Sequence, residues 1–449
     1  MQPPPRKITA WLQSAPPAVA AAYAVVFSFA AYFSMFAFRK PFAAASYEGA
    51  AFAGGSLQLK SALVIGQICG YGLAKFIGVK LLPETRRSAR APMLVAMILA
   101  ALAALVLFAV LPANLKALAM FLNGLPLGMV WGLVVWYLEG RRSSEILLAG
   151  LSTSFIIASG AVKDVGRAVL AGDDVPLLGL VLPNPLPAVD ENWMPAVVGG
   201  VFLLPFVAAV YMLDRLPDPS PRDVAERSLR TTMDWRQRGA FIVRFLPGMA
   251  LLVATYFFVT AFRDFRDNYA VEIFAELDYP YEQNRTIVSR SELLAGLGVA
   301  AVMALVYFVR DNARALMAVF GVMTAGLLLL GGATWLHQRG QIGGFAWMSL
   351  AGLGSYLTYV PYNTVLFDRL IASTRTVGTA VFAIYVADSF GYVGSVSMLA
   401  TKDLWAARLS KVEFLQTFAY GLSAAGAVCL VFSAVYFRNI TRCRTTTAD

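Results

Sequence analysis

Two arginines occupy matching positions in the two halves of the chain, and their side chains could bind an anion together. Residues 32–39 (YFSMFAFR) and 256–263 (YFFVTAFR) share five of eight residues at an offset of 224 in a chain of 449. The segments end in Arg39 and Arg263. A guanidinium binds phosphate or carboxylate through two parallel hydrogen bonds, so this pair predicts a clamp for a small anion.

A second, weaker repeat supports an internal duplication. Its offset is 228 residues, again close to half the chain length. Chance similarity between apolar helices is the alternative, but two offsets near the half-length favour duplication. The matched residues are Leu122, Gly124, Leu125 and Arg141 in the first half, and Leu350, Gly352, Leu353 and Arg369 in the second.

Burial of these arginines would be costly, which bears on their role. An arginine inside a membrane costs about 2.5–3.5 kcal/mol on insertion scales and persists mostly beside a cavity or a partner. The alternative places both at the outer interface, where Arg39 extends to water and Arg263 pairs with Asp267 one turn away. The apolar residues 41–45 predict that the first helix continues past Arg39 and keeps it below the interface.

Other charged residues lie within apolar stretches of the sequence. Lys163, Asp164 and Arg167 lie near the outer end of the stretch 146–170, where they could extend the anion site, form an external gate, or pair with one another. Glu292 begins the stretch 289–309 and could form a switchable ion pair with Arg263, or be hydrated at a loop.

Asp388 is an isolated carboxylate within an apolar stretch, with Tyr392 one turn later. Burial of an ionisable group in a membrane points to function. Asp388 could be a proton-coupling site, or it could form a gating salt bridge with a cation such as Arg39, Arg263 or Lys163.

The composition excludes a soluble enzyme. Hydrophobic residues make up 58% of the chain and charged residues 14%, against about 45–50% and about 25% in soluble domains. The three cysteines have no metal-site spacing and His337 is the only histidine, so a zinc centre or a histidine-dependent triad lacks its residues. No Walker motif is present, and no cofactor is expected.

Apolar stretches of about 20 residues predict membrane-spanning helices, and the chain contains twelve of them. The predicted fold class is therefore an all-α membrane protein of twelve helices in two six-helix bundles. The predicted spans are 18–40, 57–79, 91–111, 116–138, 146–170, 194–213, 241–262, 289–309, 315–336, 344–366, 377–400 and 412–437.

Loop charges predict the orientation and the domain division. With both termini in the cytoplasm, most loop Lys and Arg residues lie inside, which accounts for the net charge of +10 without nucleic acid as a partner. The polar segment 214–240 predicts a cytoplasmic linker between an N-terminal bundle, 1–213, and a C-terminal bundle, 241–449.

Glycines recur at every fourth position of the predicted span 116–138. Gly124, Gly128 and Gly132 would lie on one face of a helix. This spacing predicts close packing against a neighbouring helix rather than ligand binding.

Several segments resemble the organophosphate:phosphate antiporters of the major facilitator superfamily. The likeness includes RKPFA at 39–43, YGLAKFI at 71–77, FLNG at 121–124 and GYVG at 391–394. It also resembles uncharacterised bacterial transporter-like proteins that share the RKPF segment. The resemblance implies two bundles related by an axis along the membrane normal, with phosphate bound by an arginine of the first helix and one of the seventh, here Arg39 and Arg263.

The resemblance also implies substrate-binding roles for further residues. These are Tyr32, Tyr71, Lys75, Tyr359 and Tyr392. The chain departs from the family in the fifth helix, where Ser159 stands at the position of a substrate-contacting histidine, with Lys163 one turn beyond.

Together these features predict a secondary transporter of a small organic anion, with a phosphorylated metabolite favoured and exchange for phosphate implied by the resemblance. The alternatives are a transporter-like receptor for the anion, a proton-coupled carboxylate transporter and a lysolipid transporter. The expected setting is a bacterial inner membrane, with the protein a monomer in the lipid bilayer.

Overall fold

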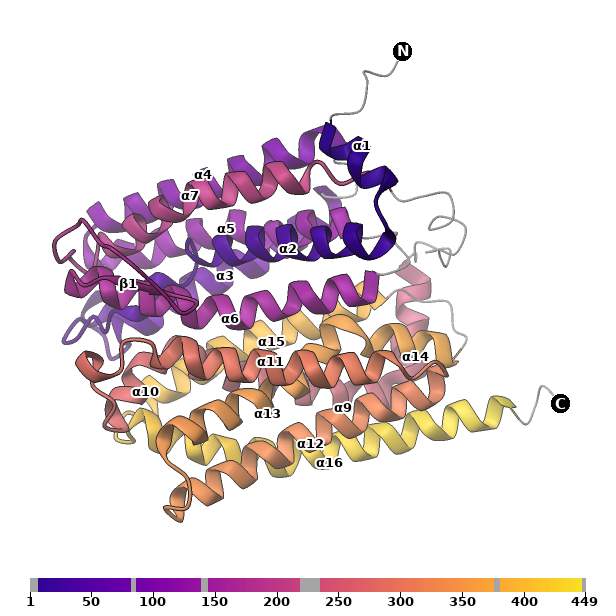
Figure 1. Cartoon of the computed structure of the whole chain (residues 1–449). Helices are drawn as coiled ribbons and strands as arrows, with labels where there is room; N and C mark the ends of the chain where they lie inside the picture. Colours follow the sequence, from indigo (N-terminus) through magenta and orange to yellow (C-terminus); the bar gives the residue numbers. More distant parts are fainter. Residues whose placement is uncertain (1–6, 82–85, 139–143, 219–234, 375–379, 446–449) are drawn as a thin grey trace. The chain divides into compact units, whose positions relative to one another are not determined.

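The computed structural model describes residues 7–81, 86–138, 144–218, 235–374 and 380–445. Almost all of this part is helical (Figure 1). It contains twelve α-helices of 20 or more residues, and each corresponds to one of the predicted spans. The all-α class is confirmed.

The chain forms two compact units. Unit 1 comprises Met1–Ser228 together with Tyr281–Ser289, and unit 2 comprises Leu229–Pro280 together with Arg290–Asp449. Residues 281–289 therefore pack with unit 1 although they follow the seventh long helix. The predicted bundle boundaries remain a prediction, and residues 219–234 of the predicted linker lie outside the described residues.

Unit 1 contains six long helices and several short elements. The long helices are α2 (Pro17–Phe36), α3 (Leu59–Leu81), α4 (Arg87–Val110), α5 (Ala113–Leu138), α6 (Ser144–Ala171) and α7 (Met194–Leu213). The short elements are α1 (Lys7–Ser14), the 3-10 turns η1 (Pro41–Ala44), η2 (Phe52–Gly54) and η3 (Tyr281–Gln283), and the antiparallel hairpin β1 (Val175–Leu177) and β2 (Leu180–Leu182).

Unit 2 contains five further long helices and most of a sixth. They are α9 (Trp235–Asn268), α12 (Asn312–Gln338), α13 (Gly344–Thr364), α15 (Ala380–Leu404) and α16 (Lys411–Thr445), with α11 (Ile287–Tyr307), whose first three residues belong to unit 1. Two short helices, α10 (Ala270–Glu276) and α14 (Leu366–Thr374), complete it.

The long helices carry apolar side chains on their outer faces as well as in their contacts. Leu204 in the middle of α7 is 76% exposed and Leu328 in the middle of α12 is 59% exposed. Ten of the helices are long and apolar enough to cross a bilayer. Apolar surface all around a helix is typical of a membrane span, so the chain is a multi-pass membrane protein.

Helix packing repeats between the two units. In unit 1, α2 packs on α6 and α7, and α4 packs on α5 and α7. In unit 2, α9 packs on α15 and α16, and α12 packs on α13 and α16. These helices occupy the same places in the chain order of the two units. The repeat seen in the sequence is therefore also present in the packing of the helices.

Glycines allow α3 and α5 to approach with backbones in contact. A Cβ at Gly70 would lie 2.0 Å from the Phe121 carbonyl oxygen, and one at Gly124 would lie 2.3 Å from the Gln67 carbonyl oxygen. A Cβ at Gly128 would lie 2.5 Å from the Tyr71 carbonyl oxygen. The predicted packing role of Gly124 and Gly128 is confirmed, and this contact holds Tyr71 at a fixed depth in unit 1.

Candidate functional site

Arg39 lies in a turn after α2 and not inside a helix. α2 ends at Phe36, and the N–H groups of Phe38 and Arg39 donate to the carbonyls of Met35 and Phe36. The expected continuation of the helix past Arg39 is therefore wrong. Pro41 is the physical reason, because it has no N–H to donate to the Ala37 carbonyl and its ring would clash with that carbonyl in a continued helix.

An aromatic ring supports the Arg39 side chain. Its guanidinium carbon lies 4.1 Å from the centre of the Tyr71 ring and 5.6 Å from that of Phe36. Gln67 donates a 2.9 Å hydrogen bond to the Arg39 carbonyl and another of 2.8 Å to Asn123. The turn is thereby tied to α3 and α5, which orients a cationic group over the face of a tyrosine.

Three other predicted residues gather around Arg39 in unit 1. Tyr32 is buried and hydrogen-bonds to Tyr71, and its ring meets Trp131 edge-on at 4.8 Å. The Lys75 ammonium lies 5.6 Å from the centre of the Tyr71 ring. Arg39, Tyr32, Tyr71 and Lys75 therefore form one cluster, which we call the Arg39 cluster.

Arg263 has a different setting in unit 2. It lies inside α9, which continues to Asn268, so the predicted end of this span at residue 262 is wrong. Its guanidinium carbon lies 4.0 Å from the centre of the Tyr359 ring, and its Nη2 lies 2.5 Å from an oxygen of Asp264. The ion-pair partner is the adjacent Asp264 instead of the Asp267 considered from the sequence.

The Asp264 carboxylate is held from two sides. One oxygen meets Arg263, and the other accepts a 2.6 Å hydrogen bond from Ser395 on α15. Asp264 is 7% exposed. In the described part of the chain the buried Nε of Arg263 has no hydrogen-bond partner, so one N–H donor of this guanidinium is unused.

Asp388 bonds to a tyrosine of the same unit, and its predicted roles in proton coupling or in a gating salt bridge remain predictions. The Tyr256 hydroxyl donates a 2.5 Å hydrogen bond to it, and Asn363 donates one of 3.0 Å to that hydroxyl. A Cβ at Gly391 would lie 2.8 Å from the Tyr256 ring, so this glycine lets α15 approach α9. Tyr392, partly exposed, lies one turn after Asp388 on α15.

An aromatic contact in unit 1 and one in unit 2 are related by the two sequence offsets. Tyr32 packs on Trp131 of α5, and Tyr256 stacks on Tyr359 of α13 with ring centres 5.3 Å apart. These pairs differ by 224 and 228 residues, the offsets of the two repeats. We call the second group (Arg263, Asp264, Tyr256, Tyr359 and Asp388) the Arg263 cluster.

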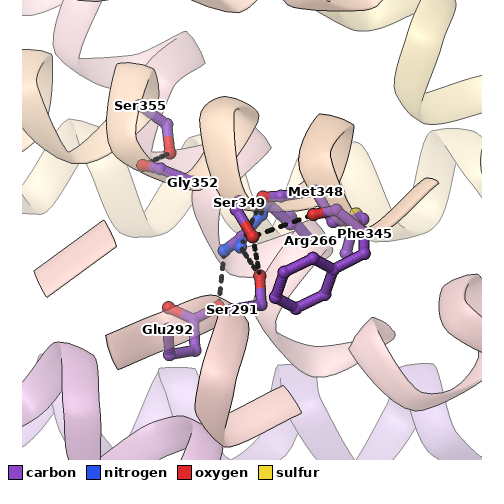
Figure 2. A network of polar contacts seen from close by, with 8 residues as sticks. All are labelled: Arg266, Ser291, Glu292, Phe345, Met348, Ser349, Gly352 and Ser355. Carbon is purple, nitrogen blue, oxygen red and sulfur yellow. Dashed lines mark hydrogen bonds and ion pairs between the residues drawn. The ribbon is translucent and has the colours of Figure 1, made fainter. Parts of the chain in front are cut away.

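Glu292 is buried and pairs with Arg266, whereas the sequence suggested either a bridge to Arg263 or hydration at a loop. The Arg266 Nη1 lies 2.7 Å from a Glu292 oxygen, and both side chains are almost fully buried. Figure 2 shows Arg266 pointing toward Ser291 and Glu292 on one side and Met348 on the other. Its Nε and Nη2 donate to the Met348 carbonyl at 3.1 and 2.8 Å. This network holds α9, α11 and α13 together.

Asp164 and Arg167 bind the segment 281–289 within unit 1. Asp164 accepts a 2.7 Å hydrogen bond from the Ser289 N–H in the first turn of α11, and it pairs with Arg167 at 3.3 Å. Arg167 donates to the Asn284 carbonyl at 3.3 Å. A carboxylate at a helix N-terminus is favourable because the exposed N–H groups carry partial positive charge. Asp164 and Arg167 thus pair with one another, as one of the sequence alternatives expected, and their roles in an anion site or a gate remain predictions. We call Asp164, Arg167 and the segment 281–289 the latch.

Two further contacts strengthen this latch. Arg285 pairs with Asp173 at 3.3 Å, and Arg167 lies 4.6 Å from the centre of the Tyr281 ring. Burial and the nearby Asp173 carboxylate raise the pKa of Tyr281 to about 12, so its hydroxyl stays protonated at neutral pH. Lys163, fully buried in α6, neighbours the latch in sequence.

A groove of about 410 Å³ on unit 2 lies apart from these residues. It runs between α12 and α16, with Gly321, Leu328 and Arg438 among its lining residues, and it contains none of the predicted site residues. Arg39 belongs to unit 1 and Arg263 to unit 2, so their joint action as a clamp remains a prediction. Sequence reasoning missed Asp264, Tyr256, Asn363 and Ser395, although the charged run RDFRD at 263–267 was a visible signal.

A family model and a solved structure match this chain. The model of a family of unknown function, DUF5690, matches residues 41–440. No curated protein matches the chain. The crystal structure of a D-xylose-proton symporter is similar with a TM-score of 0.55 and 14% identity, over 92% of this chain and 96% of that chain. The predicted major facilitator fold is confirmed, while the resemblance to organophosphate antiporters remains a prediction.

Proposed function

The chain belongs to the DUF5690 family of unknown function, and from its fold and its two arginine clusters we propose that it is a secondary transporter of a small organic anion. Alternating access of its two halves would move the anion, and Arg39 and Arg263 would bind it. A phosphorylated metabolite is the favoured cargo, with phosphate as the exchanged ion.

One observation carries this proposal. Each arginine lies on the face of a tyrosine, Arg39 on Tyr71 and Arg263 on Tyr359, at 4.1 and 4.0 Å. The N–H donors of a guanidinium stacked in this way point outward along its edge, the geometry with which arginine forms two parallel bonds to an oxyanion. The membrane setting makes such residues costly unless they serve binding or pairing.

A binding screen tests the proposal. Thermal stabilisation of the purified protein by phosphorylated and carboxylated metabolites would be compared among wild type, Arg39→Lys and Arg263→Lys, with the exposed Arg438→Lys as a matched control. We expect stabilisation by a hit in wild type and the control and its loss in both cluster variants. Retention in either variant removes that residue from the anion site.

Measurement of anion flux across liposomes distinguishes a transporter from a receptor. The hit, labelled, would be placed inside liposomes that contain the protein, with unlabelled anion or phosphate outside. We expect exchange of label that depends on both arginines. Binding without flux would identify an anion receptor instead.

A second candidate function is proton-coupled transport of the anion, and the Arg263–Asp264 ion pair favours it. A carboxylate already neutralises the arginine of unit 2. An anion that binds the same edge of this guanidinium would displace that carboxylate, and protonation of the carboxylate is the simplest way to release it.

A further inference from the structure

The adjacent charges Arg263 and Asp264 face each other although neighbouring residues of a helix normally do not. Successive residues of an α-helix point about 100° apart, so an i,i+1 pair requires help from surrounding groups. Tyr359 supports the guanidinium from α13, and Ser395 holds the carboxylate from α15. The surrounding helices thus hold Asp264 on the arginine, where a ligand carboxylate or phosphate would bind.

The repeat shows that this carboxylate is particular to unit 2. The offset of 224 residues that aligns Arg39 with Arg263 also aligns Lys40 with Asp264. The position after the arginine is therefore cationic in one half and anionic in the other. A symmetric clamp of two free guanidiniums does not describe these residues.

We propose that Asp264 competes with the transported anion for Arg263, and that anion binding is accompanied by uptake of one proton on Asp264. This inference rests on the proposed anion site at Arg263. When the anion takes the guanidinium, the buried Asp264 loses its counter-charge and stands beside a second negative group. It then takes a proton from hydronium in the solvent, so that one O–H bond of the hydronium breaks as one O–H bond forms on the carboxylate, and the protonated carboxyl still bonds to Ser395.

The described side chains of α13 and α16 that lie near Arg263 and Asp264 are aromatic and carry no carboxylate. On α13, Tyr356 and Tyr359 face Arg263, and on α16 the side chains packed against this part of α9 are aromatic, Phe414 and Phe418.

Other charged groups near Asp264 already have partners. On α15, Asp388 bonds to Tyr256, and Lys402 and Asp403 lie two turns beyond Ser395. On α9, Arg266 pairs with Glu292, and Asp267 lies near Tyr356. Asp264 is the carboxylate in direct contact with Arg263.

Linkage gives the expected size of the effect. If binding takes up one proton, the affinity for the anion rises by up to about tenfold for each unit of decrease in pH. Sulfate is a suitable probe because it stays dianionic between pH 5.5 and 7.5, so any pH dependence comes from the protein.

The experiment measures sulfate affinity by thermal stabilisation of the full-length protein at several pH values in this range. We expect tighter binding at low pH in wild type, and pH-independent binding, at least as tight as wild type at pH 7.5, in Asp264→Asn. Ser395→Ala, which keeps the carboxylate, should keep the pH dependence. Arg263→Lys should lose the sulfate response at every pH.

Proton uptake provides a second readout that needs no variant. Addition of sulfate to weakly buffered wild-type protein should raise the pH of the solution. The size of the change should correspond to uptake of about one proton per bound sulfate. Asp264→Asn, where it folds, should show no such change.

The outcomes separate this inference from the proposed function. Sulfate binding that depends on Arg263 but not on pH would overturn the inference and leave the anion site standing. A pH dependence that survives in Asp264→Asn but disappears in Asp388→Asn would assign the proton to Asp388 and overturn it as well. Absence of sulfate binding in wild type and Asp264→Asn would overturn both.

Discussion

Removal of the Glu292 side chain should destabilise unit 2 strongly, because it leaves the Arg266 charge buried without its counter-ion. Arg266 and Glu292 are 0% and 1% exposed, and their charged atoms lie 2.7 Å apart (Figure 2). The perturbation is Glu292→Ala, compared with Glu292→Gln and with the control Glu282→Ala, a glutamate in an exposed turn.

The magnitude follows from the bonds that remain. In Glu292→Ala the guanidinium keeps its two bonds to the Met348 carbonyl but loses the charge-assisted bond from Nη1. Breaking a buried ion pair at one partner costs about 3–5 kcal/mol. Glu292→Gln keeps a neutral acceptor and should cost less, about 1.5–3 kcal/mol. The control should stay within about 0.5 kcal/mol of wild type.

The assay is reversible unfolding in mixed micelles with increasing SDS, followed by tryptophan fluorescence. Buried Trp347, next to Met348, is one of the eight tryptophans that contribute to this signal. The double variant Arg266→Met with Glu292→Leu should be more stable than Glu292→Ala, because no charge is left unpaired. A free energy of unfolding for Glu292→Ala within about 1 kcal/mol of wild type would refute the reasoning, as would a double variant no more stable than Glu292→Ala.

Three further perturbations test packing and the latch. Gly352→Ala places a Cβ 2.5 Å from the Arg266 Nη2 and should lower the free energy of unfolding by about 1–3 kcal/mol. The control Gly421→Ala, whose Cβ would meet nothing within 4 Å, should leave it unchanged. Equal stability of the two variants would contradict the contact. Gly70→Ala sets a Cβ against backbone and should prevent the close approach of its helix to α5, measured as a loss of about 3 kcal/mol or of folded protein; wild-type stability would show that the helices can separate. Asp164→Ala removes the acceptor for the Ser289 N–H and should speed hydrogen exchange in residues 281–289, and unchanged exchange there would remove Asp164 from the latch.

Residues that are unusual within apolar stretches could be identified from the sequence, but their partners could not. Arg263, Asp388 and Glu292 were visible because charge inside a membrane span is rare. Their partners, Asp264, Tyr256 and Arg266, were missed or misassigned because pairing depends on helix rotation. Arg263 and Arg266 are three residues apart, so they lie about 60° apart around the helix and about 4.5 Å apart along it, and the orientation of α9 decides which of them meets Glu292.

Local backbone chemistry accounts for the other differences. Pro41 ends the first long helix before Arg39, a signal that was present in the sequence but outweighed by the apolar run around it. The equivalent position in the second half holds Phe265 where the first has Pro41, and there α9 continues to Asn268. The repeated arginines thus share a sequence context and differ in backbone conformation.

The amino-acid sequence alone determined that this protein lies in a membrane, that it contains twelve long helices and that its halves repeat, because bilayer thickness and the cost of exposed polar groups act on composition and length. Only the tertiary structure decided that Arg263 carries its own carboxylate, that Glu292 belongs to Arg266 and that residues 281–289 pack with unit 1. Those outcomes depend on which faces of separate helices meet, and on glycines such as Gly352 and Gly391 that bring the helices close enough for short side chains to touch.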